Sequence, residues 1–160
     1  MAWEDLGPTG GVVWSDPTEW ERRRTPEGCV ICRAGSPLFV IAETEACWVT
    51  GEPDAALPGY ICVTSKQHVN EPFDLAAEDQ GRFWIDAMKV AQGIASVTQA
   101  IKMNYEIHGN TLPHLHLHLF PRYLGDPYVG GPVDPRRASF RRSPEDIERL
   151  RAAVLAALGE

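Results

Sequence analysis

The feature that most constrains this chain is a regular alternation of histidine and leucine. Its members are His114, Leu115, His116, Leu117, His118 and Leu119. In an extended strand successive side chains point to opposite faces, whereas a helix would scatter them around its circumference. The alternation therefore predicts a strand that buries its leucines on one face and carries three imidazoles in a row on the other.

The residues on either side of this row favour phosphate chemistry. A neutral imidazole can act as a nucleophile, a proton carrier or a metal ligand near neutral pH. Upstream, Asn110 and Thr111 follow Gly109 and offer an amide and a hydroxyl, which donate to phosphate oxygens without a fixed charge. Downstream, Arg122 supplies a guanidinium suited to bidentate phosphate contact. The alternative is a solvated strand face, but histidine is an uncommon residue for that purpose.

The Cys-x-x-Cys motif at residues 29–32 is the second candidate site. Two thiolates at this spacing can share one metal ion, and a tetrahedral zinc site would need two more ligands, for which His68 and His114 are the candidates. Four protein ligands leave no open position, so such a metal is predicted to be structural. The alternatives are a redox dithiol, whose usual context of a helix after a strand is not recognisable here, and two buried apolar thiols.

Hydrophobic periodicity predicts an α+β domain with an antiparallel sheet. Short β-branched and aromatic runs predict strands at residues 38–41, 46–50, 60–65 and 102–107, and Cys47 and Cys62 inside them are interpreted as core residues. A helix capped by Asp74 is predicted over residues 74–101 and is expected to cover the leucine face with Phe83, Ala87, Val90, Ile94, Val97 and Ile101. Two further helices are predicted after Asp16 and Ser143, each of which precedes a proline.

Residues 114–120 resemble the signature of the histidine triad (HIT) family, His-φ-His-φ-His-φ-φ, where φ is apolar. The stretch from Pro58 to His68 is similar to the family's second signature, in which Pro-Gly opens a strand that ends near a histidine. The resemblance implies a HIT-like fold with an antiparallel sheet of about five strands, one long central helix and a C-terminal helix, commonly as a homodimer. It also implies nucleotidyl transfer or hydrolysis at an α-phosphate. His116 would be the nucleophile, and His118 would contact the phosphate and exchange protons.

The resemblance extends to further site residues. Several branches of the family carry a structural zinc ion, whose ligands carried over to this chain are Cys29, Cys32, His68 and His114. Asn110 stands where the family often has glutamine, which keeps the amide but shortens its reach. Asn104 matches a position where the family often has a polar residue near the phosphate or sugar, although an ordinary strand amide is the alternative. His108 has no role in the family and is interpreted as a surface turn residue.

The length and the net charge of the chain limit which classes of protein it can belong to. A chain of 160 residues is long enough for one domain with a sizeable core. We divide it into an N-terminal extension packing on the core (1–26), a HIT domain (27–125) and a C-terminal loop and helix (126–160).

The net charge of −7 argues against general nucleic-acid binding, and no membrane segment or signal peptide is recognisable, so we expect a cytoplasmic protein. Four arginines lie close together near the C-terminus: Arg136, Arg137, Arg141 and Arg142. This basic run could lie over the phosphates of a nucleotide, but we interpret it as a solvated edge.

These features together predict a nucleotide hydrolase or nucleotidyl transferase. His116 would attack the α-phosphorus and form a covalent nucleotidyl-histidine, which water or another acceptor then releases. His118, Asn110 and Thr111 would hold the phosphate oxygens. Dinucleoside polyphosphates are the first expected substrates and nucleoside phosphoramidates the second. Two alternatives stay open: a catalytic metal site formed by the three histidines, and a nucleotide sensor or scaffold without turnover.

Overall fold

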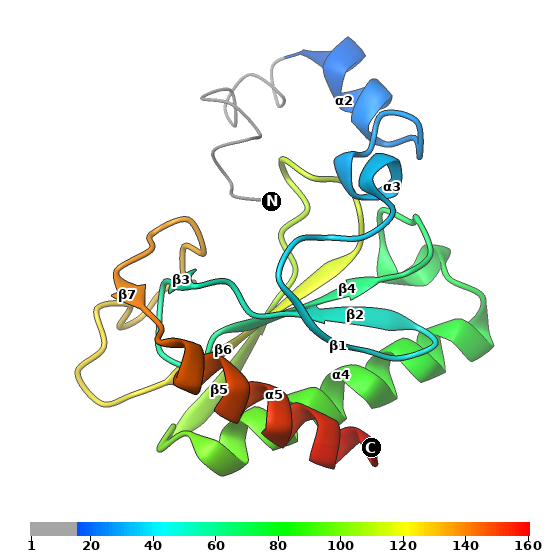
Figure 1. Cartoon of the computed structure of the whole chain (residues 1–160). Helices are drawn as coiled ribbons and strands as arrows, with labels where there is room; N and C mark the ends of the chain where they lie inside the picture. Colours follow the sequence, from blue (N-terminus) through cyan, green and yellow to red (C-terminus); the bar gives the residue numbers. More distant parts are fainter. Residues whose placement is uncertain (1–15) are drawn as a thin grey trace.

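The histidine row lies at a central strand of an antiparallel sheet. In the computed structural model, which describes residues 16–160, five strands pair in the order β1-β2-β4-β6-β5 (Figure 1). They are β1 (Val40–Glu43), β2 (Cys47–Thr50), β4 (Ile61–Ser65), β5 (Lys102–Glu106) and β6 (His116–Arg122). Every neighbouring pair is antiparallel, so the predicted fold class is confirmed.

The alternation along β6 separates a chemical face from a core face. The register against β4 pairs His116 with Thr64 and Leu117 with Val63. Because directly opposite residues share a face, the histidines lie with Thr64, and the leucines lie with Val63 in the hydrophobic core. The regular strand begins at His116, two residues later than the alternation suggests, so His114 precedes it.

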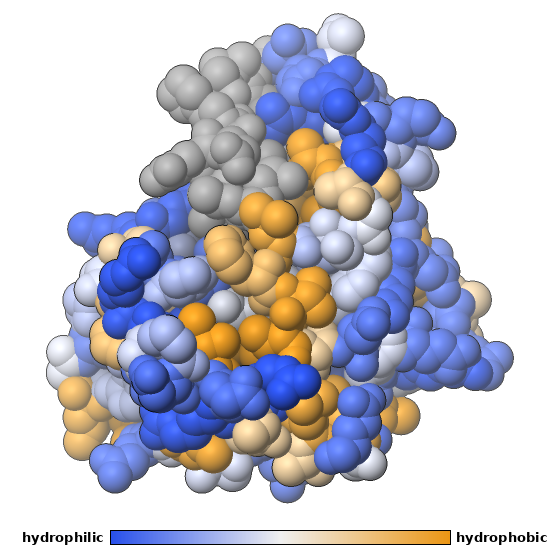
Figure 2. Space-filling model, in the orientation of Figure 1, coloured by the Kyte–Doolittle hydropathy of each residue, from blue (hydrophilic) through white to orange (hydrophobic). Residues whose placement is uncertain are grey.

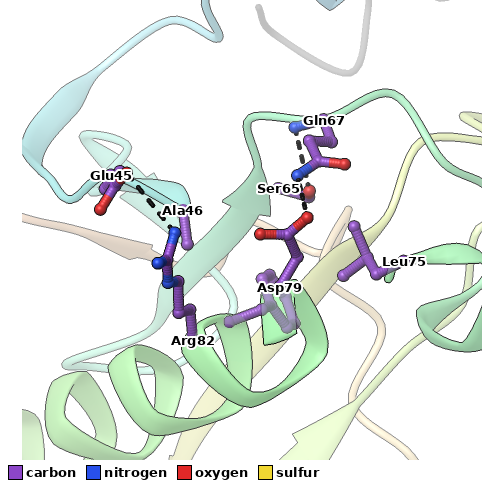
Figure 3. A pocket seen from close by; sticks show the side chains of 8 residues that line it. Glu45, Ala46, Ser65, Gln67, Leu75, Asp79 and Arg82 are labelled. Atoms are coloured by element: carbon purple, nitrogen blue, oxygen red, sulfur yellow. Dashed lines mark hydrogen bonds and ion pairs between the residues drawn. The ribbon is translucent and has the colours of Figure 1, made fainter. Parts of the chain in front are cut away.

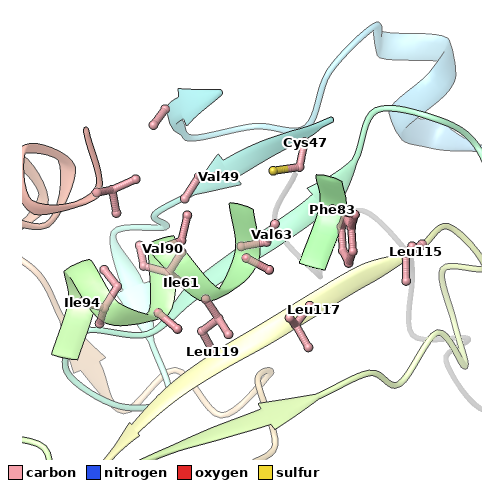
Figure 4. Close-up of a cluster of buried hydrophobic side chains, with 14 of the residues drawn as sticks. Cys47, Val49, Ile61, Val63, Phe83, Val90, Ile94, Leu115, Leu117 and Leu119 are labelled. Carbon is pink, nitrogen blue, oxygen red and sulfur yellow. The ribbon is translucent and has the colours of Figure 1, made fainter. Parts of the chain in front are cut away.

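The long helix α4 (Ala77–Val97) covers the leucine face of the sheet, as predicted. Figure 4 shows side chains of the helix and of three strands meeting in one layer. Its largest members are almost completely buried: Phe83, Ile94, Ile61, Leu115, Leu117 and Leu119. Burying a side chain of this size contributes about 1.5–3 kcal/mol, so this layer fixes which face of β6 is left for the imidazoles.

Both predicted ends of α4 were wrong. Asp74 belongs to a separate 3-10 turn, η2 (Pro72–Asp74), where its carboxylate accepts from the backbone N–H of Glu71, and the residue that caps α4 is Ala76. A local turn thus satisfies the polar group that suggested a helix cap. The helix ends at Val97, so Ile101 lies outside it and is 64% exposed.

The C-terminal helix α5 (Pro144–Leu158) packs on α4 (Figure 1). Ser143 caps it through a capping box, as predicted, and Leu150 and Val154 are buried against the core. The helices approach closely at Gly93, where a Cβ atom would lie 2.6 Å from the carbonyl oxygen of Ala153. The absence of a side chain at this position therefore permits the contact.

The remaining elements lie beside the sheet. Helix α2 (Pro17–Arg23) begins after Asp16, whose carboxylate accepts from two backbone N–H groups as predicted. Helix α3 (Val30–Ala34) and the small sheet of β3 (Asp54–Ala55) and β7 (Phe140–Arg141) were not predicted. Residues 1–15 of the predicted N-terminal extension lie outside the described residues. Among residues 16–160, no helix is both long and apolar enough to cross a membrane.

Candidate active site

The tautomer of His116 is set by a backbone contact. Its Nδ1 lies 2.6 Å from the carbonyl oxygen of His114, which can only accept, so Nδ1 carries the proton and donates. The neutral ring then has its lone pair on Nε2. The side chain is buried, and this burial lowers the pKa of His116, which favours the neutral form near pH 7. His116 is therefore held as an uncharged imidazole with a defined tautomer.

His118 is held by a tyrosine that the sequence analysis did not single out. The hydroxyl of Tyr60 lies 2.8 Å from Nδ1 of His118, and the two rings are stacked. Burial lowers the pKa of His118 well below its usual range and raises the pKa of Tyr60 well above its own, so this contact joins a neutral imidazole to a phenol. The rings of His116 and His118 meet edge to face at 4.9 Å.

We expect Tyr60→Phe to lower kcat for the nucleotide hydrolysis that the sequence predicts by about tenfold to hundredfold. Losing a hydrogen bond to a buried group costs about 1–3 kcal/mol, and the loss leaves the His118 ring free to rotate. Steady-state kinetics with thermal unfolding of the same protein would measure this. Tyr123→Phe is the matched control, since the Tyr123 hydroxyl donates to the carbonyl of Pro58 and not to a histidine. A wild-type kcat in Tyr60→Phe would contradict the role of Tyr60 in holding His118.

Two cavities share His116 in their lining and differ in the side chains around it. The larger, of about 280 Å³, combines polar side chains, among them Asn110, Thr111 and His118, with apolar ones such as Val133. The smaller, of about 60 Å³, is lined by apolar side chains such as Ile31 and Leu38, together with a few polar ones, among them Glu52. Figure 2 shows hydrophobic side chains gathered in the middle of the visible face, around the region where β1 begins. A ligand that reaches both cavities would meet more charged and hydrogen-bonding side chains in the larger one.

The structure brings some predicted phosphate ligands to these cavities and leaves others away from them. Asn110 and Thr111 line the larger cavity with His116. Asn104 lines neither cavity, and its amide contacts Lys102 and Glu106 within β5. Arg122 also lines neither: it donates to Asp126 at 2.7 and 2.8 Å and to the carbonyl of Tyr128. The described geometry therefore gives Asn104 and Arg122 no contact with the site.

Other residues that line the cavities were given different roles by the sequence analysis. His108, interpreted as a surface turn residue, lines the larger cavity, as does Arg136. Cys62, interpreted as a core residue, faces the smaller one. Arg142 of the basic run is buried and donates to the carbonyls of Glu52 and Tyr60, so it stabilises the fold and is not a solvated edge.

Four side chains converge to form a metal-binding geometry. The ligand atoms of Cys29, Cys32, His68 and His114 all lie within 4.8 Å of one another. The separations include 3.3 Å from Cys29 Sγ to His114 Nδ1 and 3.3 Å from Cys32 Sγ to His68 Nδ1. A tetrahedral zinc ion with bonds of about 2.0–2.3 Å would hold its ligand atoms about 3.3–3.8 Å apart. The predicted ligand set therefore fits the expected dimensions.

The hydrogen bonds around the two histidines of this cluster also fit a cation. Nε2 of His114 donates to the carbonyl of Ser65 at 2.8 Å, and Nε2 of His68 donates to the carbonyl of Arg24 at 2.7 Å. Both Nδ1 atoms then carry lone pairs, and they face each other at 3.3 Å. Two lone pairs at this distance repel unless a cation lies between them, and such carbonyl contacts are the usual way to orient metal-binding imidazoles.

A third cavity, of about 110 Å³, lies between β4 and α4, and none of the three triad histidines lines it (Figure 3). Its charged side chains contact one another or nearby polar groups: Arg82 lies 3.5 Å from Glu45, and Gln67 donates to Asp79 at 2.8 Å. These groups are already engaged within the protein, so we assign this cavity no ligand.

The sequence profile of the HIT domain family matches residues 33–125. The chain is 31% identical over 75 residues to the Arabidopsis thaliana bifunctional bis(5'-adenosyl)-triphosphatase/adenylylsulfatase, which is 44% of this chain and 42% of that protein. It is also 31% identical over 97 residues to the asymmetrical bis(5'-nucleosyl)-tetraphosphatase of Schizosaccharomyces pombe, which is 58% of this chain and 52% of that protein. The chain thus spans about half the length of these two curated relatives.

Solved structures share the fold. A histidine triad protein from Sinorhizobium meliloti superimposes with a TM-score of 0.66 and 25% identity, covering 74% of this chain and 88% of that one. A zinc-bound histidine triad family protein from Mycobacterium smegmatis gives a TM-score of 0.59 and 24% identity, covering 82% of this chain and 96% of that one.

Proposed function

The chain belongs to the histidine triad (HIT) domain family, and on this premise we propose that it is a nucleotide hydrolase that cleaves dinucleoside polyphosphates at the α-phosphate. The observation that carries the proposal is the fixed tautomer of His116, which leaves the lone pair on Nε2 of a ring that lines both cavities. The names of the two curated relatives, both hydrolases of dinucleoside polyphosphates, support the substrate class.

The reaction has two displacements at one phosphorus. Nε2 of His116 forms a bond to the α-phosphorus while the bond to the leaving oxygen breaks and its electron pair departs with the leaving group. Water then bonds to the same phosphorus and loses a proton to solvent, the electron pair of the P–N bond returns to Nε2 of His116, and a nucleoside monophosphate is released. His118, Asn110 and Thr111 stabilise the charge that builds on the phosphate oxygens.

The two cavities suggest how the substrate lies. The polyphosphate occupies the larger cavity, where Asn110, Thr111 and Arg136 can donate to its oxygens. The nucleoside lies against the apolar side chains of the smaller cavity, and the Glu52 carboxylate there can accept from sugar hydroxyls. The α-phosphorus is thereby placed at their junction, beside His116.

We propose that the metal held by the Cys29, Cys32, His68 and His114 cluster is zinc and that it is structural. All four coordination positions come from the protein, so the ion supplies a cross-link and no open site for substrate. The contact that fixes the His116 ring comes from the backbone carbonyl of His114 and not from its metal-binding side chain. The four cysteines are free, as is usual in a reducing compartment, which supports a cytoplasmic location.

We propose that the protein is a homodimer joined at β5. This strand forms one edge of the sheet, and its side chain Tyr105 and the following Ile107 are 48% and 38% exposed. An exposed edge with apolar side chains favours pairing with another strand.

Sedimentation should give about twice the 17.7 kDa mass of one chain. Tyr105→Glu should weaken dimerisation at least about tenfold, because the paired edge would then bury two charges. Leu124→Glu, in an exposed loop, is the control, and a monomeric wild-type protein would contradict the proposal.

The proposed activity is tested by incubating the protein with dinucleoside triphosphates, dinucleoside tetraphosphates and nucleoside phosphoramidates in H₂¹⁸O. Release of a nucleoside monophosphate that carries one ¹⁸O atom supports hydrolysis at the α-phosphate. Tight binding without turnover would instead indicate a nucleotide sensor. Label only in the polyphosphate product would place the attack at another phosphorus and contradict the proposal.

A further inference from the structure

A carboxylate and an imidazole outside the triad form a fixed pair at the end of β5. Nε2 of His108 lies 3.0 Å from Oε2 of Glu106, and Oε1 of Glu106 accepts from the backbone N–H of Val133 at 3.1 Å. Glu106 is also the direct cross-strand partner of His118. The carboxylate thus joins the turn that carries His108 to the loop that carries Val133, and it orients the ring of His108.

The ring of His108 shares the larger cavity with the triad. Its centroid lies 5.2 Å from that of His118, the two planes are nearly perpendicular, and the side chain is 32% exposed. Among residues 16–160, Nδ1 of His108 has no hydrogen-bond partner. The other charged groups that line this cavity, Asp134 and Arg136, pair with each other at 3.0 Å. His108 is therefore a partly accessible imidazole whose second nitrogen is available to a ligand.

We propose that His108 is a substrate-contacting residue that binds the leaving polyphosphate and makes the enzyme selective for polyphosphate leaving groups. The inference rests on the proposed function and deepens it. In its protonated form the ring donates from both nitrogens, from Nε2 to Glu106 and from Nδ1 to a phosphate oxygen.

The contact acts during the first displacement. As Nε2 of His116 bonds to the α-phosphorus, the electron pair of the breaking P–O bond moves onto the leaving polyphosphate, and the hydrogen bond from His108 strengthens with the added charge. The proton stays on His108. A leaving group without phosphate, such as the amine of a nucleoside phosphoramidate, does not make this contact.

The test compares these two substrates in three variants of His108. His108→Ala should lower kcat/KM for a dinucleoside tetraphosphate by about tenfold to hundredfold, which is the usual size for one charge-assisted hydrogen bond, and change kcat/KM for a phosphoramidate less than about threefold. His108→Asn, which keeps a donor near the position of Nδ1, should recover part of the loss. His108→Gln, which keeps a polar group only toward Glu106, should not.

Each outcome decides between possibilities. Equal losses for both substrates, or rescue by glutamine but not by asparagine, would show that His108 is merely structural, and thermal unfolding of each variant would record the same defect. No loss for either substrate would also overturn the inference. A wild-type protein that cleaves neither substrate refutes the proposed function itself, and one that cleaves only the phosphoramidate refutes the polyphosphate contact.

Discussion

Replacing His116 by alanine should lower kcat for a dinucleoside tetraphosphate by at least about four orders of magnitude, because removing a covalent nucleophile costs about this much or more. The other two histidines of the triad do not offer an equivalent group: His118 is engaged with Tyr60, and His114 lies in the metal-binding cluster. Product formation measured by chromatography over hours would detect the residual rate. The variant should still bind the substrate, since the cavities and their donors remain.

A fold control is necessary because His116 is 4% exposed and packs in the interior. Circular dichroism and the thermal midpoint of His116→Ala should stay close to those of the wild-type protein, with a loss of stability of about 1–3 kcal/mol at most. A folded His116→Ala protein that hydrolyses the tetraphosphate at a near wild-type rate would show that the nucleophile lies elsewhere.

Removing the metal should produce the largest loss of stability. Structural zinc contributes about 10–16 kcal/mol of apparent binding free energy in small zinc domains. Even a third of that would lower the thermal midpoint by about 10 °C or more in a protein of this size. Cys29→Ser should therefore lose bound zinc, measured by atomic absorption, and unfold at a clearly lower temperature. Cys62→Ser is the matched control, because Cys62 lies outside the cluster and should leave one zinc ion per chain.

The same experiment separates a structural metal from a catalytic one. Chelated protein kept below its lowered thermal midpoint should retain turnover, since His116 and His118 are not among the four ligands. Immediate loss of turnover in a folded, chelated protein would instead support the catalytic three-histidine site. A protein that contains no metal and keeps its full thermal midpoint would contradict the structural role.

Local patterns predicted the fold because a few residues with strong conformational preferences mark it. The alternation around His116 works as a signal because β6 has a core face and a chemical face, so each leucine is buried under α4. Ser143 and Asp16 precede prolines and could be identified as helix caps from neighbouring residues alone. The same reasoning gave a wrong start for α4 at Asp74. The residue type favours a helix cap, but Asp74 lies in the separate turn η2.

Only those residues of the candidate site that belong to a sequence motif could be predicted. The four members of the metal cluster come together as the spacing and the resemblance indicated. Tyr60, His108 and Arg136 could not be found this way, because their roles depend on which side chain lies opposite after folding. A buried tyrosine hydroxyl needs a partner, but the sequence does not say that the partner of Tyr60 is His118. The same holds for Arg142, whose basic neighbours suggested a solvated edge although it is buried.

The central claim is that His116 carries the nucleotidyl group between two displacements. The most direct test is the configuration of the α-phosphorus after hydrolysis in H₂¹⁸O of a dinucleoside polyphosphate with a single-diastereomer α-phosphorothioate. Each in-line displacement inverts the phosphorus, so a covalent intermediate predicts overall retention in the released nucleoside phosphorothioate. Overall inversion would mean a single direct attack by water and would contradict the proposed role of His116.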